Sequence, residues 1–252
     1  LQHTSNLYYT TPGAELAEAL CERTGYKKVF FCNSGAEANE AAIKTARKYS
    51  FDKYGAGRDK IITLDKSFHG RTMATLTATA QEAMHNYFFP FNEGFVYCGK
   101  DIEEIKKQEG VCAVMLEFIQ GEGGVIPQNK QFIAQVYDYC KKSDILFIAD
   151  EVQTGVGRTG KFLCSEHYGV HPDVTTLAKG LGGGLPVGAM LVGEKCENVM
   201  GAGTHGSTFG GNPVVCAGGK YVLSRIDEKL LEEVAAKGEY IKSRLEGVKG
   251  VK

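Results

Sequence analysis

The sequence lacks an excess of charge of either sign. Its 252 residues contain 29 lysines and arginines against 30 aspartates and glutamates, so the formal net charge is −1. This balance provides no long-range field that would attract nucleic acid or an anionic membrane surface. No apolar stretch approaches the roughly 18 residues that span a bilayer, and no secretory signal pattern opens the chain. We therefore expect no nucleic acid and no membrane partner, and any anionic ligand must be held by local geometry.

Closely spaced cysteines are missing as well. The eight cysteines lie at least 11 residues apart, so the chain contains no CxxC motif. This spacing excludes sequence-local zinc and thioredoxin-like motifs, and we predict no metal site. A chain of this length does not need disulfides for stability. Buried free thiols in a reducing, cytoplasmic setting are therefore expected.

The residues that are present indicate an ordinary globular protein, with 43% apolar and 23% charged residues. The chain can form one large domain or two modest ones. Short apolar runs alternate with helical patterns, which predicts an α/β fold with a mainly parallel central sheet flanked by helices. Strands are expected at 29–32, 61–64, 111–116 and 145–149, and helices at 15–24, 36–54, 72–80, 130–142, 218–227 and 228–245.

One motif opens the long helix that follows the first strand. Ser34 and Glu37 fit the S-x-x-E capping box, so a well-capped helix is the simpler interpretation. The same segment suits an anion, because Gly35 permits close approach and the first turn has free N–H groups. From this segment alone, capping is the more common role.

An aromatic ring beside a cation follows the next strand, at Phe68 and Arg71. A phenylalanine is usually a core residue, and the intervening His69 usually has a structural role. Alternatively, Phe68 offers a platform for a planar ring. Arg71 can hold a carboxylate with two parallel hydrogen bonds.

A carboxylate and a lysine occur at two later positions. Asp150 ends the apolar run 145–149 at a strand's carboxyl end, where ligands of such sheets bind. Lys179 follows in the glycine-rich segment 177–186, which by itself indicates only a turn. Pyridoxal phosphate (PLP) chemistry requires such a pair, namely an amine for the cofactor aldehyde and an acid for the ring nitrogen.

Other candidate sites are weaker. Glu117 and Glu122 are five residues apart but lack a nearby metal-ligand partner, so solvated or salt-bridged carboxylates are expected. Segment 155–162 fits the dinucleotide pattern and nearly fits the P-loop pattern, but we reject both interpretations. A dinucleotide site needs an acid about 20 residues further on, where the chain has its glycine-rich segment, and Phe162 replaces the hydroxyl residue that a P-loop requires. His167 and His171 are assigned structural roles. The polar loop 205–213 is either a turn or a second phosphate contact.

Five segments occur in one order: Ser34–Ala38, Phe68–Arg71, Asp150–Gln153, Lys179 and Gly206–Thr208. Together they resemble the class III (ω-amino acid) PLP-dependent aminotransferases of fold type I. The match is greatest to the members that act on N-acetylornithine. The resemblance implies ping-pong transfer of an amino group from N-acetylornithine or a similar ω-amino acid to 2-oxoglutarate, in arginine biosynthesis. It also implies a homodimer with shared sites.

The resemblance implies a role for each matching residue. Lys179 would bind PLP covalently and act as general base, with partial burial favouring its neutral form, while Asp150 would pair with the ring nitrogen. The other implied cofactor contacts are Ser34, Gly35 and Ala36 at the phosphate, Phe68 on the ring, Glu151, Val152 and Gln153 beside it, and Thr208 at the phosphate of a neighbouring subunit. The implied substrate contacts are Arg71 at the α-carboxylate, Ser207, and Glu122 as a switch residue.

The resemblance also implies a domain division. Residues 1–225 would form the PLP-binding large domain without its N-terminal segment, and residues 226–252 would lead into a mostly absent small domain. Leu1 is not an initiator methionine, which agrees with a piece of a longer protein. Phe118 departs from the family, whose members usually have proline there.

Several alternatives remain open from the sequence. Within the same class they are an ornithine or 4-aminobutyrate aminotransferase and an aminomutase. Outside it they are a nucleotide-binding module that uses segment 155–160 and an inactive fragment that serves as a folding or interaction unit.

Overall fold

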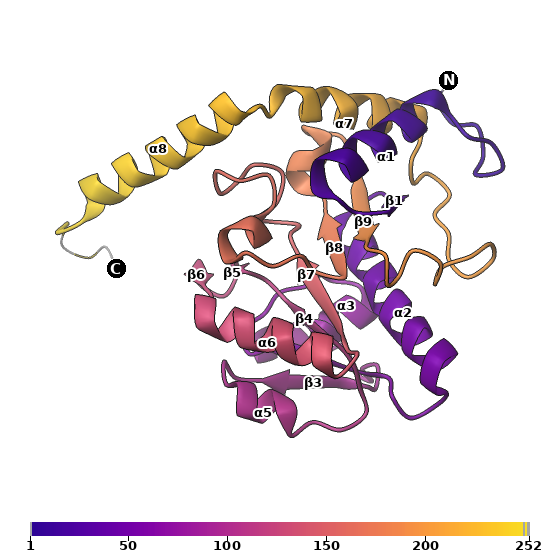
Figure 1. Cartoon of the computed structure of the whole chain (residues 1–252), viewed down its shortest axis with the longest axis vertical. Helices are drawn as coiled ribbons and strands as arrows, with labels where there is room; N and C mark the ends of the chain where they lie inside the picture. Colours follow the sequence, from indigo (N-terminus) through magenta and orange to yellow (C-terminus); the bar gives the residue numbers. More distant parts are fainter. Residues whose placement is uncertain (1, 249, 251–252) are drawn as a thin grey trace.

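A seven-stranded sheet forms the centre of the computed structural model, which describes residues 2–248 and 250 (Figure 1). The strands lie in the order β1-β9-β8-β7-β4-β2-β3. All neighbouring pairs are parallel except the two that involve β9, which confirms the predicted mainly parallel sheet. The strands are β1 (Lys28–Cys32), β2 (Lys60–Leu64), β3 (Phe95–Cys98), β4 (Val111–Leu116), β7 (Leu146–Asp150), β8 (Val174–Leu177) and β9 (Gly188–Val192), with a separate hairpin of β5 (Ile119–Gln120) and β6 (Ile126–Pro127).

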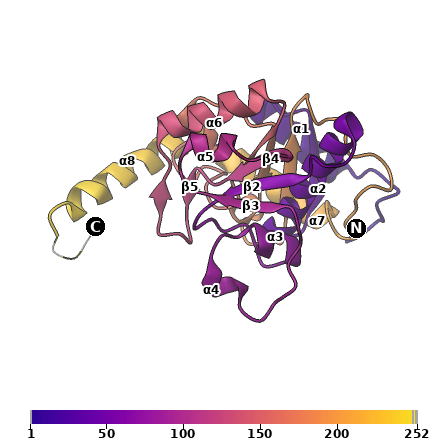
Figure 2. The same cartoon turned by 90° about the horizontal axis from the view of Figure 1, so that it is seen from below.

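Helices cover both faces of this sheet. Figure 2 shows the sheet between α5 and α6 on one side and α3 and α4 on the other. The helices are α1 (Thr11–Thr24), α2 (Gly35–Tyr54), α3 (Met73–Ala78), α4 (Glu82–His85), α5 (Ile102–Lys106), α6 (Lys130–Lys142), α7 (Pro213–Arg225) and α8 (Glu228–Leu245), with short 3-10 helices η1 (Cys164–Tyr168) and η2 (Lys179–Gly182). The predicted helices are present with shifted ends, most clearly at α1 and α7.

Alternate residues of one strand identify the helices on each face. Met190 and Val192 of β9 belong to the core cluster under α2, whereas Ala189 and Leu191 belong to the cluster under α1 and α7. Successive side chains of a strand point to opposite faces. The molecule therefore has three layers, with the sheet in the middle.

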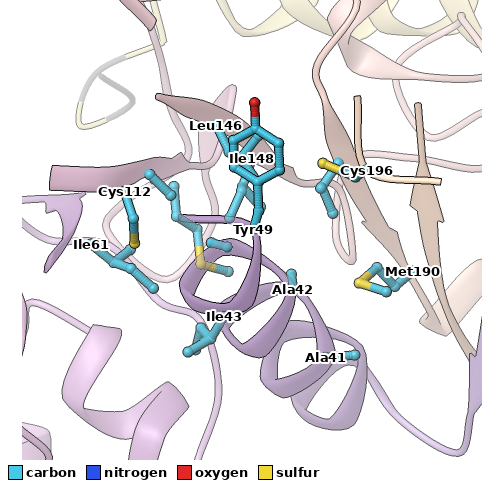
Figure 3. Packing of buried hydrophobic residues seen from close by; sticks show 14 of the residues in the cluster. Ala41, Ala42, Ile43, Tyr49, Ile61, Cys112, Leu146, Ile148, Met190 and Cys196 are labelled. Carbon is cyan, nitrogen blue, oxygen red and sulfur yellow. The ribbon is translucent and has the colours of Figure 1, made fainter. Parts of the chain in front are cut away.

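Small residues let α2 lie close to the sheet. Ala41 and Ala42 of α2 belong to the same buried cluster as Met190 and Ile148 of the sheet (Figure 3). These side chains are almost completely buried. Burying a side chain the size of Ile148 stabilises the fold by roughly 1.5–3 kcal/mol. The resulting contact fixes the position of the helix over the strand ends.

The N-terminus of α2 is capped, as predicted, but with a different second bond. Ser34 Oγ accepts a hydrogen bond from the Glu37 N–H at 3.2 Å. The Glu37 carboxylate accepts from the backbone N–H of Asn33 at 2.8 Å rather than from that of Ser34. Glu37 therefore also fixes the residue before the cap, at the exit of β1.

Three strands of the central sheet, β3, β8 and β9, were not predicted. For β8 and β9 the reason is that their polar or glycine residues have distant partners. Thr175 and Thr176 of β8 are completely buried. The Thr175 hydroxyl lies 2.6 Å from the Tyr26 hydroxyl, and Thr176 donates to Asn39 at 2.7 Å. Gly188 begins β9 where the Ser34 carbonyl approaches it. These pairings are not visible in local hydrophobic patterns.

The last helix extends away from the body of the molecule (Figure 1). Asp227 caps α8, and Leu231 is its one buried residue. Of the segment 226–252 predicted to lead into a second domain, residues 249, 251 and 252 lie outside the described residues. The predicted boundary at residue 225 stays a prediction. Within the described part of the chain, no helix combines the length and apolar character needed to cross a membrane.

We predict that Gly188→Ala destabilises the fold, since a Cβ there would lie 2.3 Å from the Ser34 carbonyl oxygen. Relieving this backbone contact is expected to cost about 1–3 kcal/mol. Gly238→Ala on α8 is the matched control, because nothing lies within 4 Å of its Cβ position. Urea unfolding measures both variants. An unfolding free energy for Gly188→Ala equal to that of wild type would contradict the close approach.

Candidate active site

A cavity of about 550 Å³ opens at the sheet edge where the parallel strands end. Its walls come from the residues that follow β1, β2, β4, β7 and β8. Ligands of such sheets bind at this edge. The predicted site residues that line the cavity are Ser34, Gly35, Ala36, Phe68, Arg71, Glu122, Asp150, Val152, Gln153 and Lys179.

The start of α2 forms one wall of the cavity. A Cβ at Gly35 would lie 2.5 Å from Val152 Cγ1, so the helix start packs directly against the segment after β7. N–H groups of a first helical turn lack acceptors within the helix. Because they lie beside Ser34, Gly35 and Ala36 at the cavity surface, this wall suits a phosphate.

Asp150 is held by three donors at the end of β7. Its Oδ2 accepts from Asn39 Nδ2 at 2.8 Å and lies 2.8 Å from His69 Nδ1, while Oδ1 accepts from the Val152 N–H at 3.1 Å. The residue is 4% exposed. Such contacts are typical of a carboxylate anion. Asp150 is therefore fixed and faces the cavity with its charge.

Asn39 was missed by the sequence analysis, although it lines the cavity. Its amide also donates to the His69 carbonyl at 2.7 Å and accepts from Thr176 at 2.7 Å. These partners fix which end of the amide faces Asp150. One signal was available, since Asn39 is a polar residue one turn after Gly35 in an alanine-rich helix.

His69 has a more specific place than the predicted structural role suggests. Its side chain is fully buried, lies beside Asp150 and lines the cavity. Within the described residues, His69 Nε2 has no hydrogen-bond partner. A buried polar atom without a partner is uncommon, and it lies in a residue that lines the cavity.

Lys179 begins η2 directly after β8, with a φ of +42°. This left-handed conformation is strained for a residue with a side chain, and such strain is concentrated at functional sites. Lys179 Nζ donates to Gln153 Oε1. The expected partial burial is wrong, since Lys179 is exposed at the cavity mouth.

Phe68 and Arg71 also line the cavity. Phe68 is half-buried, and the Arg71 guanidinium lies 5.6 Å from the centre of its ring. Arg71 is exposed to the cavity. The pair therefore offers the site an aromatic face and an exposed cation.

Of the two glutamates after β4, one agrees with the expectation of a solvated carboxylate and one does not. Glu122 is exposed, but Glu117 is buried and lines the cavity. Burial raises the pKa of Glu117 to about 7. The interpretation of Glu117 as a solvated or salt-bridged carboxylate is therefore wrong.

Glu151, Ser207 and Thr208 do not line the cavity. Glu151 points the opposite way from Asp150, because neighbouring residues of extended backbone alternate in direction. Its carboxylate accepts from the Cys164 and Ser165 N–H groups. Ser207 Oγ accepts a hydrogen bond from Asn33 Nδ2 at 3.0 Å, and Asn33 itself lines the cavity. Thr208 is exposed.

The rejected motifs have packing roles. A Cβ at Gly157 would contact Ile226 and Leu231, and one at Gly160 would contact Ala235. The glycines of segment 155–160 therefore seat the start of α8. Among the described residues, no group of three or more histidine, cysteine or acidic side chains is placed to hold a metal ion.

Comparison with known proteins agrees with this geometry. A family model for class-III aminotransferases matches residues 1–251. Acetylornithine aminotransferase from Haemophilus ducreyi is 50% identical over 256 residues, which cover 100% of this chain and 65% of that protein. Acetylornithine aminotransferase from Caldanaerobacter subterraneus subsp. tengcongensis is 52% identical over 98% of this chain and 63% of that protein.

A solved structure gives the same result. The ornithine aminotransferase from Toxoplasma gondii, which has partial occupancy of PLP at its active site, superposes with a TM-score of 0.92 at 33% identity. The match covers 97% of this chain and 60% of that chain. The chain thus spans less than two thirds of each of these relatives. Because the family model and the relatives cover nearly all of its residues, the chain belongs to the class-III aminotransferase family.

Proposed function

We propose that the protein is a PLP-dependent aminotransferase that moves an amino group from N-acetylornithine, or a similar ω-amino acid, to 2-oxoglutarate. One observation carries the proposal. Lys179, Asp150 and the N-terminus of α2 come from distant parts of the sequence but line the same cavity. They are an amine, an acid and an anion-binding helix end, which are the three groups that PLP requires.

The cavity fits PLP in its donor set. Phe68 provides a face for the ring, and Asp150 provides a fixed acid for the ring nitrogen. Ser34, Gly35 and Ala36 provide the phosphate wall, and Val152 packs against it. When bound, PLP supplies an electron sink for charge that develops on the substrate carbon.

Side chains of the protein would provide the covalent attachment, the proton transfer and the orientation of the lysine amine. Lys179 would hold PLP covalently and would serve as the general base that moves a proton at the substrate carbon. Such acid–base catalysis typically contributes 10²–10⁴-fold. Gln153 accepts a hydrogen bond from Lys179 and so orients its amine toward the cavity. The strained backbone of Lys179 further restricts that orientation.

Arg71 determines the class of substrate in this proposal. Its exposed guanidinium can bind an α-carboxylate in two parallel hydrogen bonds, which would present the distant amine to the cofactor. Glu122 lines the cavity, and Ser207 accepts a hydrogen bond from Asn33, which also lines it, so both residues would complete the substrate contacts. The acetylornithine relatives favour N-acetylornithine. The Toxoplasma gondii structure keeps ornithine as the second candidate.

We extend the proposal to the assembly and setting of the enzyme. Thr208 is exposed and lies outside the cavity of its own chain, as expected if it reaches the phosphate of a neighbouring subunit in a homodimer. All eight cysteines are free, and seven of them are buried. These thiols support a reducing, cytoplasmic location. The reaction would be a step of arginine biosynthesis.

Lys179→Ala is expected to abolish covalent attachment of PLP, since no other lysine lines the cavity among the described residues. Borohydride reduction followed by peptide mapping measures attachment. The control is Lys237→Ala, a surface lysine paired with Glu233 on α8. Reduced PLP that still maps to this chain in Lys179→Ala would sink the assignment. Affinity for ATP or NAD without PLP would favour the nucleotide-binding module, and no ligand at all would favour an inactive fragment.

Arg71→Ala is expected to raise KM for N-acetylornithine about 10- to 100-fold, the effect of losing a charge-assisted contact. Thermal stability should not change, because Arg71 is exposed. Arg225→Ala, an exposed arginine at the end of α7, serves as the control. Steady-state kinetics of the full-length protein with 2-oxoglutarate measure KM for N-acetylornithine. An unchanged KM would show that Arg71 does not bind the substrate.

A further inference from the structure

Glu117 is a buried acid in the cavity for which the proposed chemistry has no use. It directly follows β4 and is 5% exposed. Within the described residues, no lysine, arginine or histidine nitrogen lies within 4 Å of its carboxylate. Burying a carboxyl without a cationic partner is costly unless its oxygens are hydrogen-bonded. Its hydrogen bonds therefore need an explanation.

Both oxygens of Glu117 accept backbone N–H groups from the walls of the cavity. Oε1 accepts from Phe68 at 2.9 Å, and Oε2 accepts from Gly121 at 3.2 Å. Phe68 belongs to the aromatic wall, whereas Gly121 begins the loop that carries Glu122. One carboxylate thus joins two segments that are 53 positions apart in the chain, from residue 68 to residue 121.

The loop held by Glu117 in turn contacts the lysine side of the cavity. A Cβ at Gly121 would lie 3.4 Å from Gln153 Cγ, so the loop packs on this side chain. Gln153 Oε1 accepts from Lys179 Nζ. The position of Gly121 therefore bears on the orientation of Lys179.

The core holds the backbone of Glu117 in place. The Glu117 carbonyl accepts from Gln128 Nε2 at 3.2 Å. The next residue, Phe118, is completely buried with its ring 4.9 Å from that of Tyr168. Tyr168 also donates to the Phe118 carbonyl at 3.0 Å. The carboxylate is thus fixed to the core, and the two cavity segments are fixed to the carboxylate.

We propose that Glu117 is a positioning residue whose carboxylate clamps the Phe68 segment to the Gly121–Glu122 loop, and that protonation of this carboxyl releases one side of the clamp. An ionised carboxylate accepts at both oxygens, whereas a protonated one carries a hydroxyl on one of them. One of the two N–H groups then loses its acceptor. The purpose of the clamp rests on the proposed function, but the contacts themselves do not.

The titration of this clamp falls in an accessible range. Burial is the main cause that raises the pKa of Glu117 to about 7. The nearby Asp150 raises this pKa further, whereas His69 lowers it. The two N–H bonds also favour the ionised form. The other charged side chains that line the cavity are Arg71, Glu122 and Lys179. The clamp is therefore complete above about pH 7 and loses one bond as the pH falls through that value.

Amide hydrogen exchange, measured on the full-length protein without added PLP, tests this inference directly. In wild type, protection of Phe68 or Gly121 is expected to fall as the pH drops from 8 to 6, after correction for the intrinsic exchange rate. Glu117→Gln keeps one acceptor oxygen and loses the other, so one of these amides should exchange about tenfold faster. Its protection should no longer depend on pH over this range.

Glu151→Gln is the matched control. Glu151 is also buried, its pKa is likewise raised to about 7 by burial, and it accepts two backbone N–H groups outside the cavity. This variant should leave the Phe68 and Gly121 amides unchanged. The clamp is overturned if the two glutamine variants expose these amides equally, or if wild-type protection is independent of pH. If Glu117→Gln does not fold, the pH dependence of amide protection in wild type still tests the clamp.

The affinity for PLP, followed by fluorescence, tests whether the clamp positions the site. Glu117→Gln is expected to weaken binding about tenfold, and Glu151→Gln to leave it unchanged. Equal affinity in Glu117→Gln and wild type would overturn the positioning role. If wild type itself binds no PLP, the proposed function fails, whereas amide exchange still tests the clamp.

Discussion

The close packing of α2 on the sheet is the constraint on which the site depends. Alanines at 41, 42 and 46 bring the helix near the strands. This short distance places Asn39 within hydrogen-bond reach of Asp150 and sets the helix start against Val152. The anion-binding helix end and the strand-end acid are therefore held at a fixed separation by the core. A bulkier helix face would move both groups apart.

Much of the fold could be predicted because its strands are continuous apolar runs. The strands β4 and β7 are fully buried, and their sequences contain almost only apolar residues. The strands β8 and β9 were missed, since Thr175, Thr176 and Gly188 resemble loop residues until their distant partners are known. Local patterns cannot contain such pairings.

The site was predictable where a residue lies at the end of an apolar strand. Asp150 ends such a strand, and that position brings it to the ligand edge. Lys179 comes shortly after β8, which was not predicted, so only its glycine-rich segment and the family resemblance indicated it. Asn39 and Glu117 were not recognised, because their partners Asp150 and Phe68 are 111 and 49 residues away. The adjacent acids Asp150 and Glu151 show a second limit. Both are conspicuous in the sequence, but only one faces the cavity.

The glycines at 157 and 160 have a mechanical consequence. At these two positions Ile226, Leu231 and Ala235 pack against bare backbone. Leu231, the one buried residue of α8, also packs in the core cluster that contains Phe162 and Leu163. A side chain at either glycine would therefore push the start of α8 away from the body of the molecule.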